Sequence, residues 1–291
     1  KWIFRLLLFV MLAILCGSLL GCNMADVGTQ AVTPGGNPGG GSGGNDGGGG
    51  GTPGGHGLWS PALVTSWQWQ LSSLPSANNL LNVQMYDVDG FGASSSLVSV
   101  MHNAGMHAVC YISAGTWEDW RSDADSFPSS VLGSGNGWPG EKWLDIRQID
   151  ALSPIMTARF QMCKDKGFDA VEPDNIDGYT NNTGFPLSYA DQIAYNKWIA
   201  TTVHSLGMSV ALKNDLEQVA DLLPHFDFAI NEQCFQFNEC DALTSFIAAN
   251  KAVFEVEYNT DTSQFCPEAN AMNFNALKKE EDLTATRVAC R

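Results

Sequence analysis

The feature that most constrains the fold of this chain is a regular alternation between short apolar segments rich in β-forming residues and longer segments with helical periodicity. Strands buried in a parallel sheet have this near-continuous apolar character, and the helices between them cover the sheet. About eight such strands predict an α/β fold, a (β/α)8 TIM barrel in a single domain, with an open doubly wound sheet as the alternative. The predicted strands span residues 66–71, 82–88, 107–113, 168–174, 208–214, 226–232, 252–258 and 285–290, with a shorter ninth at 143–146.

Two of the intervening helices have clear start and stop signals. Ser153 followed by Pro154 predicts the start of one helix, and Gly167 predicts its end. Ser188 and Asp191 have the spacing of a capping box at the start of a second helix.

The N-terminal part of the chain differs from the rest. Residues 1–21 combine a basic start with an apolar run, which is typical of a secretory signal peptide, and they end in the lipobox-like sequence LLGC. We expect Cys22 to be lipidated. A transmembrane anchor is the alternative, but the apolar run is short for one. Residues 22–58 then form a linker, because 15 of the 23 residues from 35 to 57 are glycine and cannot bury apolar surface.

This pattern predicts an exported bacterial lipoprotein at the outer membrane or cell surface, with a folded domain at residues 59–291 that touches the membrane only through its lipid anchor.

Six cysteines remain in that domain, and an even number in an exported chain predicts three disulfides. We expect no metal, since CxxC and histidine-ligand spacings are absent from the sequence. The expected pairs are Cys234–Cys240, Cys266–Cys290 and Cys110–Cys163.

The charge of the chain narrows the class of partner. Loss of Lys1 and Arg5 with the signal peptide would change the formal charge from −16 to −18. Such an acidic domain disfavours nucleic acids and anionic glycans, and it suits a cationic partner or serves solubility alone. We expect a monomer without a cofactor, because neither GxGxxG nor GxxxxGKT follows the first strands.

Polar residues follow most of the predicted strands at their carboxyl ends. In a TIM barrel these ends meet on one face, where active sites are built. The segment VEPDNIDGY is the densest example, and it adds Asn175 and Asp177 to the tip residue Asp174. The remaining tip residues are Tyr86, Asp87, Ser113, Lys213, Asn214, Glu232, Glu257 and Tyr258.

Two of these tip residues suit acid–base chemistry on a sugar linkage. Glycoside hydrolysis generally uses two carboxylates that flank one bond. Asp174 and Glu232 end two different strands with one strand between them, so they can approach a substrate from two sides. The alternative for either residue alone is a capping or turn-forming role.

Tryptophans supply candidate surfaces for stacking sugar rings. Trp67 and Trp69 alternate with glutamines and therefore share one face of their strand. They are predicted either to bind substrate or to pack in the barrel. Trp117 lies in the loop segment 113–121, which either binds substrate or packs as a lid on itself.

Several segments together resemble glycoside hydrolase family 114, the endo-α-1,4-polygalactosaminidases. The similar segments run from Trp67 to Tyr258 and include WQWQLS, YDVDGF, CYISAGTWEDWR, GFDAVEPDNIDGY, LKNDLEQ, FAINEQCFQFNEC and VFEVEY. The resemblance implies a (β/α)8 barrel that cleaves α-1,4-linked galactosamine chains internally, with Asp174 as nucleophile and Glu232 as acid/base. It also implies that the pocket is lined by Tyr86, Asp87, Asn175, Asp177, Lys213, Asn214 and Glu257.

One departure from the family concerns a cysteine. Many relatives carry one near the position of Phe168, whereas the nearest here is Cys163, which puts the Cys110–Cys163 pair in doubt.

Three other functions remain open at this point. A non-catalytic glycan-binding surface lipoprotein could use the same barrel, and so could a glycosidase for another α-linked sugar. A metal-dependent deacetylase would need histidine ligands, for which the sequence has no suitable set.

Overall fold

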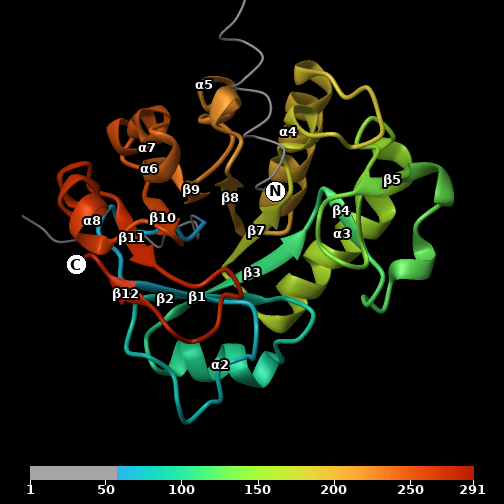
Figure 1. Ribbon diagram of the computed structural model, residues 1–291. Helices are drawn as coiled ribbons and strands as arrows, with labels where there is room; N and C mark the ends of the chain where they lie inside the picture. Colours follow the sequence, from blue (N-terminus) through green and yellow to red (C-terminus); the bar gives the residue numbers. More distant parts are fainter. Residues whose placement is uncertain (1–57) are drawn as a thin grey trace, which may run out of the picture. The chain divides into compact units, whose positions relative to one another are not determined.

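Eight parallel strands form the centre of the molecule, and helices surround them (Figure 1). The computed structural model describes residues 58–291, which form one compact unit. The predictions of a signal peptide, of lipidation at Cys22 and of a glycine-rich linker fall on residues outside this range, apart from residue 58. Within residues 58–291 no helix has the length and apolar character needed to cross a membrane.

The strands follow one another around the barrel in chain order. Each strand pairs with the next, and the seam of the barrel lies between the first and the eighth. The parallel strands are β1 Trp67–Gln70, β2 Met85–Asp89, β3 His107–Ser113, β7 Ala170–Asp174, β8 Ser209–Lys213, β9 Phe228–Glu232, β10 Val253–Glu257 and β11 Asn275–Lys278. The helices are α2 Ser95–Asn103, α3 Ile149–Lys166, α4 Tyr189–Ser205, α5 Val219–Leu222, α6 Cys234–Phe237, α7 Thr244–Ala248 and α8 Thr262–Ala271. The predicted TIM barrel is therefore confirmed.

The strand predictions need two corrections. The eighth parallel strand is β11, a four-residue strand with polar ends that the apolar pattern missed. The predicted strand at 285–290 contributes only β12 (Val288–Ala289), which pairs antiparallel with β11. The short strand predicted at 143–146 is β6 (Glu141–Leu144), and it belongs to a separate sheet with β4 (Thr116–Glu118) and β5 (Leu132–Gly135) inserted between β3 and α3.

The helix signals are correct at two of the three predicted ends. The capping box of Ser188 and Asp191 forms at the start of α4, and Gly167 ends α3 with a φ of 92°. The start of α3 was predicted too late, because the helix begins at Ile149 and Pro154 lies inside it. The buried Leu152 extends the apolar face of α3 by one turn ahead of the proline.

Side chains alternate between the barrel interior and the layer under the helices. Trp67 and Trp69 point into the interior, where Met85, Val109 and Phe254 also lie. Both tryptophans are 1% exposed, and the Trp67 ring lies 5.0 Å from that of Phe254. The prediction of an exposed sugar-stacking surface on β1 is therefore wrong, since large aromatic rings are what fills the interior of this barrel.

The barrel closes between β1 and β11 through side chains and loops. Within the described part of the chain, no strand ladder joins β1 to β11. Instead Trp67 Nε1 donates to the Asn275 carbonyl at 2.8 Å. The buried Lys279 Nζ donates to Gln68 Oε1 at 3.1 Å and to the carbonyls of Thr284 and Thr286 at 3.0 and 2.9 Å.

All three expected disulfides are present. Cys110–Cys163 joins β3 to α3, Cys234–Cys240 closes the loop after β9, and Cys266–Cys290 attaches the C-terminus to α8. The departure from the family near Phe168 therefore does not break the first pair.

The barrel seam yields a stability prediction. Lys279→Met should lower the free energy of unfolding by about 2–4 kcal/mol, because the Gln68 oxygen and two loop carbonyls lose a charged donor. Lys278→Met is the matched control, since Lys278 forms only a surface ion pair with the exposed Asp261 and should change stability by less than about 1 kcal/mol. Denaturant unfolding measures both, and equal losses would contradict the role given to Lys279.

Candidate active site

The period-two alternation brings a polar layer together at the carboxyl end of the barrel. Val109, Ala170 and Ala211 are apolar and face the barrel interior. Because side chains alternate along a strand, the residues two positions further along these strands also face inward. The residues of this layer are Asp87, Tyr111, Glu172, Asp174, Lys213, Glu232 and Tyr258. They lie directly above the apolar interior.

Lys213 joins the two predicted catalytic carboxylates. Its Nζ lies 2.9 Å from Asp174 Oδ1 and 2.7 Å from Glu232 Oε2, so these two oxygens are at most about 5.6 Å apart, the sum of the two distances. The lysine side chain is 1% exposed, and its Nζ lies 5.1 Å from the centre of the Trp69 ring. Trp69 thus lies beneath the site.

Asp174 is held in one orientation by several donors. Tyr111 OH donates to Oδ2 at 2.9 Å, and the backbone N–H of Asn175 donates to Oδ1 at 2.8 Å. Burial and the Asp174 carboxylate raise the pKa of Tyr111 well above its usual range, so the phenol keeps its proton. The sequence reasoning missed Tyr111, although it lies two residues before Ser113 on the inward face of β3.

Glu232 is the more accessible of the two carboxylates, with a side chain that is 19% exposed against 11% for Asp174. Tyr258 OH donates to its Oε1 at 2.6 Å, and Asn214 Nδ2 donates to its Oε2 at 3.2 Å. Asn214 Oδ1 also accepts the backbone N–H of Glu232 at 3.0 Å. The predicted tip residues Asn214 and Tyr258 therefore position Glu232.

A buried pair of carboxyl groups lies beneath Lys213. Glu172 Oε2 accepts from Trp69 Nε1 at 2.9 Å, and Glu172 Oε1 lies 4.0 Å from Lys213 Nζ. Asp87 is fully buried, and an ionised Asp87 would have no donor for either oxygen. Burial, and next the charge of Glu172, raise the pKa of Asp87 well above its usual range. Burial also raises the pKa of Glu172 to about 7, although the charge of Lys213 acts to lower it. The raised pKa favours the protonated form of Asp87.

Two of the predicted pocket residues face the other way. Tyr86 is 1% exposed and lies in the core between the sheet and the helices, where its OH accepts from the backbone N–H of Leu81. Glu257 points to the start of α6 and accepts the backbone N–H groups of Phe235 and Gln236 at 2.8 and 3.1 Å. The prediction that they line the pocket is wrong, because each is one residue out of phase with the inward face.

Ser113 and Asn175 link the site to the inserted sheet. Asn175 Nδ2 donates to Ser113 Oγ at 3.0 Å and to Glu141 Oε1 of β6 at 3.3 Å. A Cβ atom at Gly115 would collide with the Asn175 carbonyl, so only glycine allows the loops after β3 and β7 to come this close. Trp117 is half-buried in the insertion, where its Nε1 donates to the Ala124 carbonyl at 3.0 Å.

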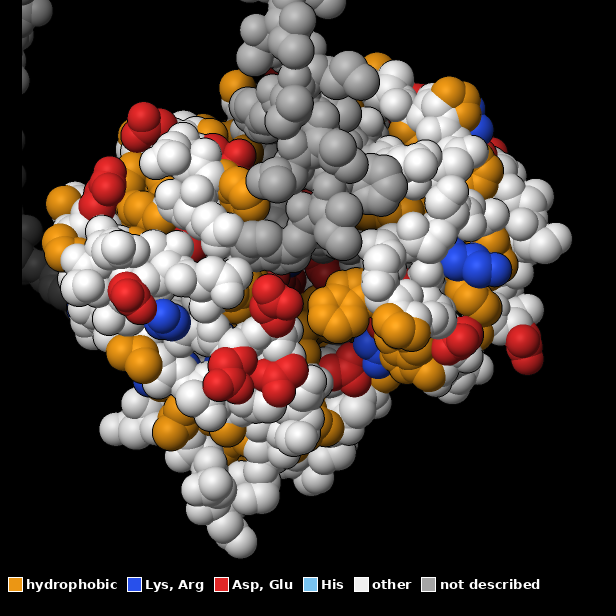
Figure 2. All heavy atoms as spheres, viewed as in Figure 1, with side chains coloured by type: hydrophobic (Ala, Val, Ile, Leu, Met, Phe, Trp, Pro, Cys, Tyr) orange, Lys and Arg blue, Asp and Glu red, His pale blue; other side chains and the backbone are white. Residues whose placement is uncertain are grey.

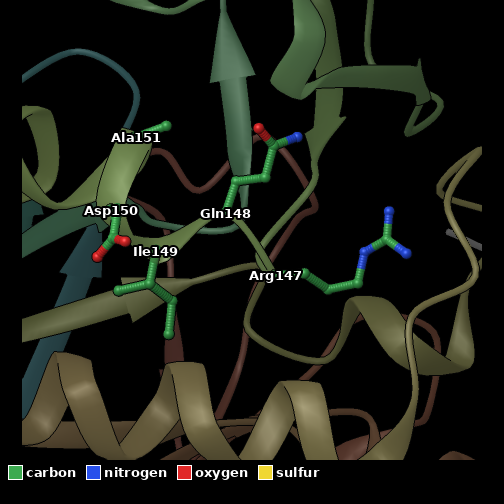
Figure 3. A pocket seen from close by; sticks show the side chains of 5 residues that line it. All are labelled: Arg147, Gln148, Ile149, Asp150 and Ala151. Carbon is green, nitrogen blue, oxygen red and sulfur yellow. The ribbon is translucent and has the colours of Figure 1, made fainter.

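A separate small pocket lies where the chain enters α3, and it has no role in this site. It is lined by Arg147, Gln148, Ile149, Asp150 and Ala151 (Figure 3), none of which belongs to the polar layer described above. Nor do residues 58–291 contain a group of three or more His, Cys, Asp or Glu side chains arranged to hold a metal ion.

Comparison with known proteins identifies the family. The model of glycoside-hydrolase family GH114 matches residues 51–291. The chain belongs to glycoside-hydrolase family GH114. Among curated proteins, no sequence matches this GH114 chain.

Solved structures agree with the GH114 assignment. The crystal structure of Aspergillus fumigatus Ega3 in complex with galactosamine is 36% identical, with a TM-score of 0.76, and the match covers 80% of this chain and 98% of that one. The glycoside hydrolase domain of PelA from Pseudomonas aeruginosa is 11% identical, with a TM-score of 0.62 and coverage of 77% and 98%. The likeness to PelA supports the fold alone.

The protonated state of Asp87 yields a prediction on pH and stability. An aspartate whose pKa is raised on folding loses stability as pH rises from its unfolded value, near 4, toward its folded value. Asp87→Asn keeps the size of the side chain and has no proton to lose. The variant should therefore unfold at a higher temperature than wild type at pH 8, with the difference shrinking toward pH 4.5. Thermal unfolding at both pH values measures this, and a variant less stable than wild type at pH 8 would show that Asp87 is ionised.

Proposed function

We propose that this GH114 glycoside hydrolase cleaves α-1,4-linked galactosamine polymers at internal linkages. The observation that carries the proposal is the placement of Asp174 and Glu232 on one lysine at the mouth of the barrel. The galactosamine in the complex of the related Ega3 supports an amino sugar as the substrate. The alternative of a non-catalytic glycan-binding protein is disfavoured, since both carboxylates are present and face each other across Lys213.

The charge of the protein agrees with a cationic polymer. Deacetylated galactosamine carries ammonium groups, and an acidic surface attracts such a chain over distances of about 10 Å at ordinary salt concentration. Figure 2 shows Asp and Glu side chains together on the face where the loop after β11 lies. Glu280, Glu281 and Asp282 are exposed in this loop.

The proposed mechanism is a double displacement with retention of configuration. Asp174 attacks the anomeric carbon while Glu232 protonates the leaving oxygen, and Glu232 then removes a proton from the water that releases the sugar. Retaining enzymes hold their carboxyl groups about 5–5.5 Å apart, whereas inverting enzymes hold them about 6.5–9.5 Å apart. The limit of about 5.6 Å between Asp174 Oδ1 and Glu232 Oε2 supports retention.

We also propose the export and anchoring predicted from the N-terminal sequence, with lipid on Cys22 and the barrel at the outer membrane or cell surface. Incorporation of labelled palmitate that disappears in Cys22→Ala would support this.

Removal of either carboxylate tests the proposed activity. Asp174→Asn and Glu232→Gln should each lower kcat on deacetylated α-1,4-galactosamine polymer by about 10³-fold or more, while the polymer still binds. Glu268→Gln, which removes an exposed carboxylate from helix α8, is the control and should keep full activity. Mass analysis of the released oligomers measures cleavage, and a wild-type protein that binds but never cuts would favour the glycan-binding alternative.

The stereochemistry of the product tests the mechanism separately. Proton NMR during the first minutes of the reaction should show the new reducing end in the α configuration, before mutarotation. An initial β product would mean inversion and would remove the nucleophilic role from Asp174.

A further inference from the structure

A second group of acidic side chains lies beside the catalytic pair, on the loops that follow β7 and β8. This rim cluster consists of Asp177, Asp215, Glu217 and Asp221 together with Tyr179 and Tyr189. The mechanism described above uses none of these residues. Asp177 was predicted to line the pocket, and the others were not singled out by the sequence.

The cluster is held by a defined set of hydrogen bonds. Asn196 Nδ2 donates to the Ile176 carbonyl and to Asp215 Oδ2, both at 2.9 Å, and so fixes Asp215 beside the loop that carries Asp177. Tyr179 OH donates to Glu217 Oε2 at 3.1 Å. The Tyr179 ring meets the edge of the Tyr189 ring at 5.6 Å, and Tyr189 OH donates to Asp221 Oδ2 at 2.6 Å.

Two carboxylate oxygens of the cluster have no hydrogen-bond partner. They are Asp177 Oδ1 and Asp215 Oδ1, on residues that are 8% and 4% exposed. Among residues 58–291, no lysine, arginine or histidine forms an ion pair with any of the four acids of the cluster. Burial, and next the charge of Asp177, raise the pKa of Asp215 to about 9. Buried carboxylates without a counter-ion are costly, so a cation from outside would stabilise this arrangement.

The position of the cluster fits a neighbouring unit of the same substrate. Asp177 follows Asp174 by three residues, which limits the distance between their α-carbons to about 11 Å. Asp215 follows Lys213 by two residues. The tyrosine rings beside the acids add faces that suit both sugar rings and ammonium groups.

We propose that the rim cluster is a subsite that binds the ammonium group of a galactosamine unit next to the linkage being cleaved, with Asp177 and Asp215 as its ligands. This inference rests on the proposed function, because it takes the polymer as the source of the cation. The rim cluster would then determine specificity, because it would favour a deacetylated sugar unit next to the reaction centre.

Binding at this subsite is coupled to a proton. Below about pH 9 Asp215 holds a proton in the free protein, and an ammonium group favours its ionised form. The other titratable groups facing it are Asp177 and Tyr179 from the loop after β7, Glu217 from its own loop, and Tyr189 from α4. None of them supplies a positive charge. Occupation of the subsite by an ammonium group therefore releases a proton at pH 7.

Kinetics on matched substrates tests the subsite. Asp177→Asn and Asp215→Asn should each raise KM for deacetylated α-1,4-galactosamine oligomers about tenfold, with kcat within twofold of wild type. KM for the N-acetylated oligomers should change less than twofold. Glu268→Gln removes a charge of the same sign from helix α8 and should leave both KM values unchanged. An equal change on both substrates, or an equal effect of Glu268→Gln, would overturn the proposal.

Calorimetry on the wild-type protein keeps the test independent of how the variants fold. Titration with the deacetylated oligomer in two buffers of different ionisation enthalpy at pH 7 should show proton release, and the N-acetylated oligomer should show none. Absence of proton release overturns the subsite, and so does equal displacement of the oligomer by potassium chloride and by ammonium chloride at matched ionic strength. A wild-type protein that shows proton release but leaves the polymer uncut would refute the proposed function and keep the subsite.

Discussion

A single nitrogen atom, Nζ of Lys213, holds the polar end of this barrel together. It contacts Asp174 and Glu232 directly and lies 4.0 Å from Glu172. A cation buried in this way is stable only because several carboxyl groups surround it, and those groups are stable only because of the cation. Burial lowers the pKa of Lys213, but the charges of Asp174, Glu232 and Glu172 outweigh it and raise the pKa well above its usual range. The lysine thus stays charged.

The barrel supplies what this ion cluster needs. Its lower interior is filled by aromatic and aliphatic side chains such as Trp67, Phe228 and Phe254, which exclude water from below. Trp69 joins the two layers, because its ring packs in the apolar interior while its Nε1 donates to Glu172. The cluster lies at the carboxyl end of the strands, so a substrate bound there meets two carboxylates whose directions are already fixed. Groups that are oriented before the substrate binds need no rearrangement during the reaction, and this lowers the activation barrier.

Much of the site could be predicted from the sequence, and the errors have physical causes. Strand-end position alone located Asp174, Lys213 and Glu232, because the carboxyl ends of parallel strands meet on one face. The same rule also selected Tyr86 and Glu257, which point to the helices, because it ignored the two-residue alternation of side chains along a strand. Applying that alternation would have rejected both.

Other features could not be obtained from the pattern of residues. The tryptophans of β1 could equally line a groove or fill the interior, and only the packing of all eight strands decides between these. Strand β11 carries too few apolar residues to stand out. The rim cluster depends on two loops that are distant in sequence and are joined through Asn196. The alternation rule would, however, have found Tyr111 and Glu172.

The measurement that tests the central role of Lys213 most directly is kcat for Lys213→Met on deacetylated galactosamine polymer. Methionine keeps much of the length and apolar character of the side chain and removes its charge. We predict that kcat falls by about 10²-fold or more in protein that remains folded by circular dichroism, because Asp174 and Glu232 then lose the donor that orients both of them. A folded variant with kcat within threefold of wild type would contradict this view of the site.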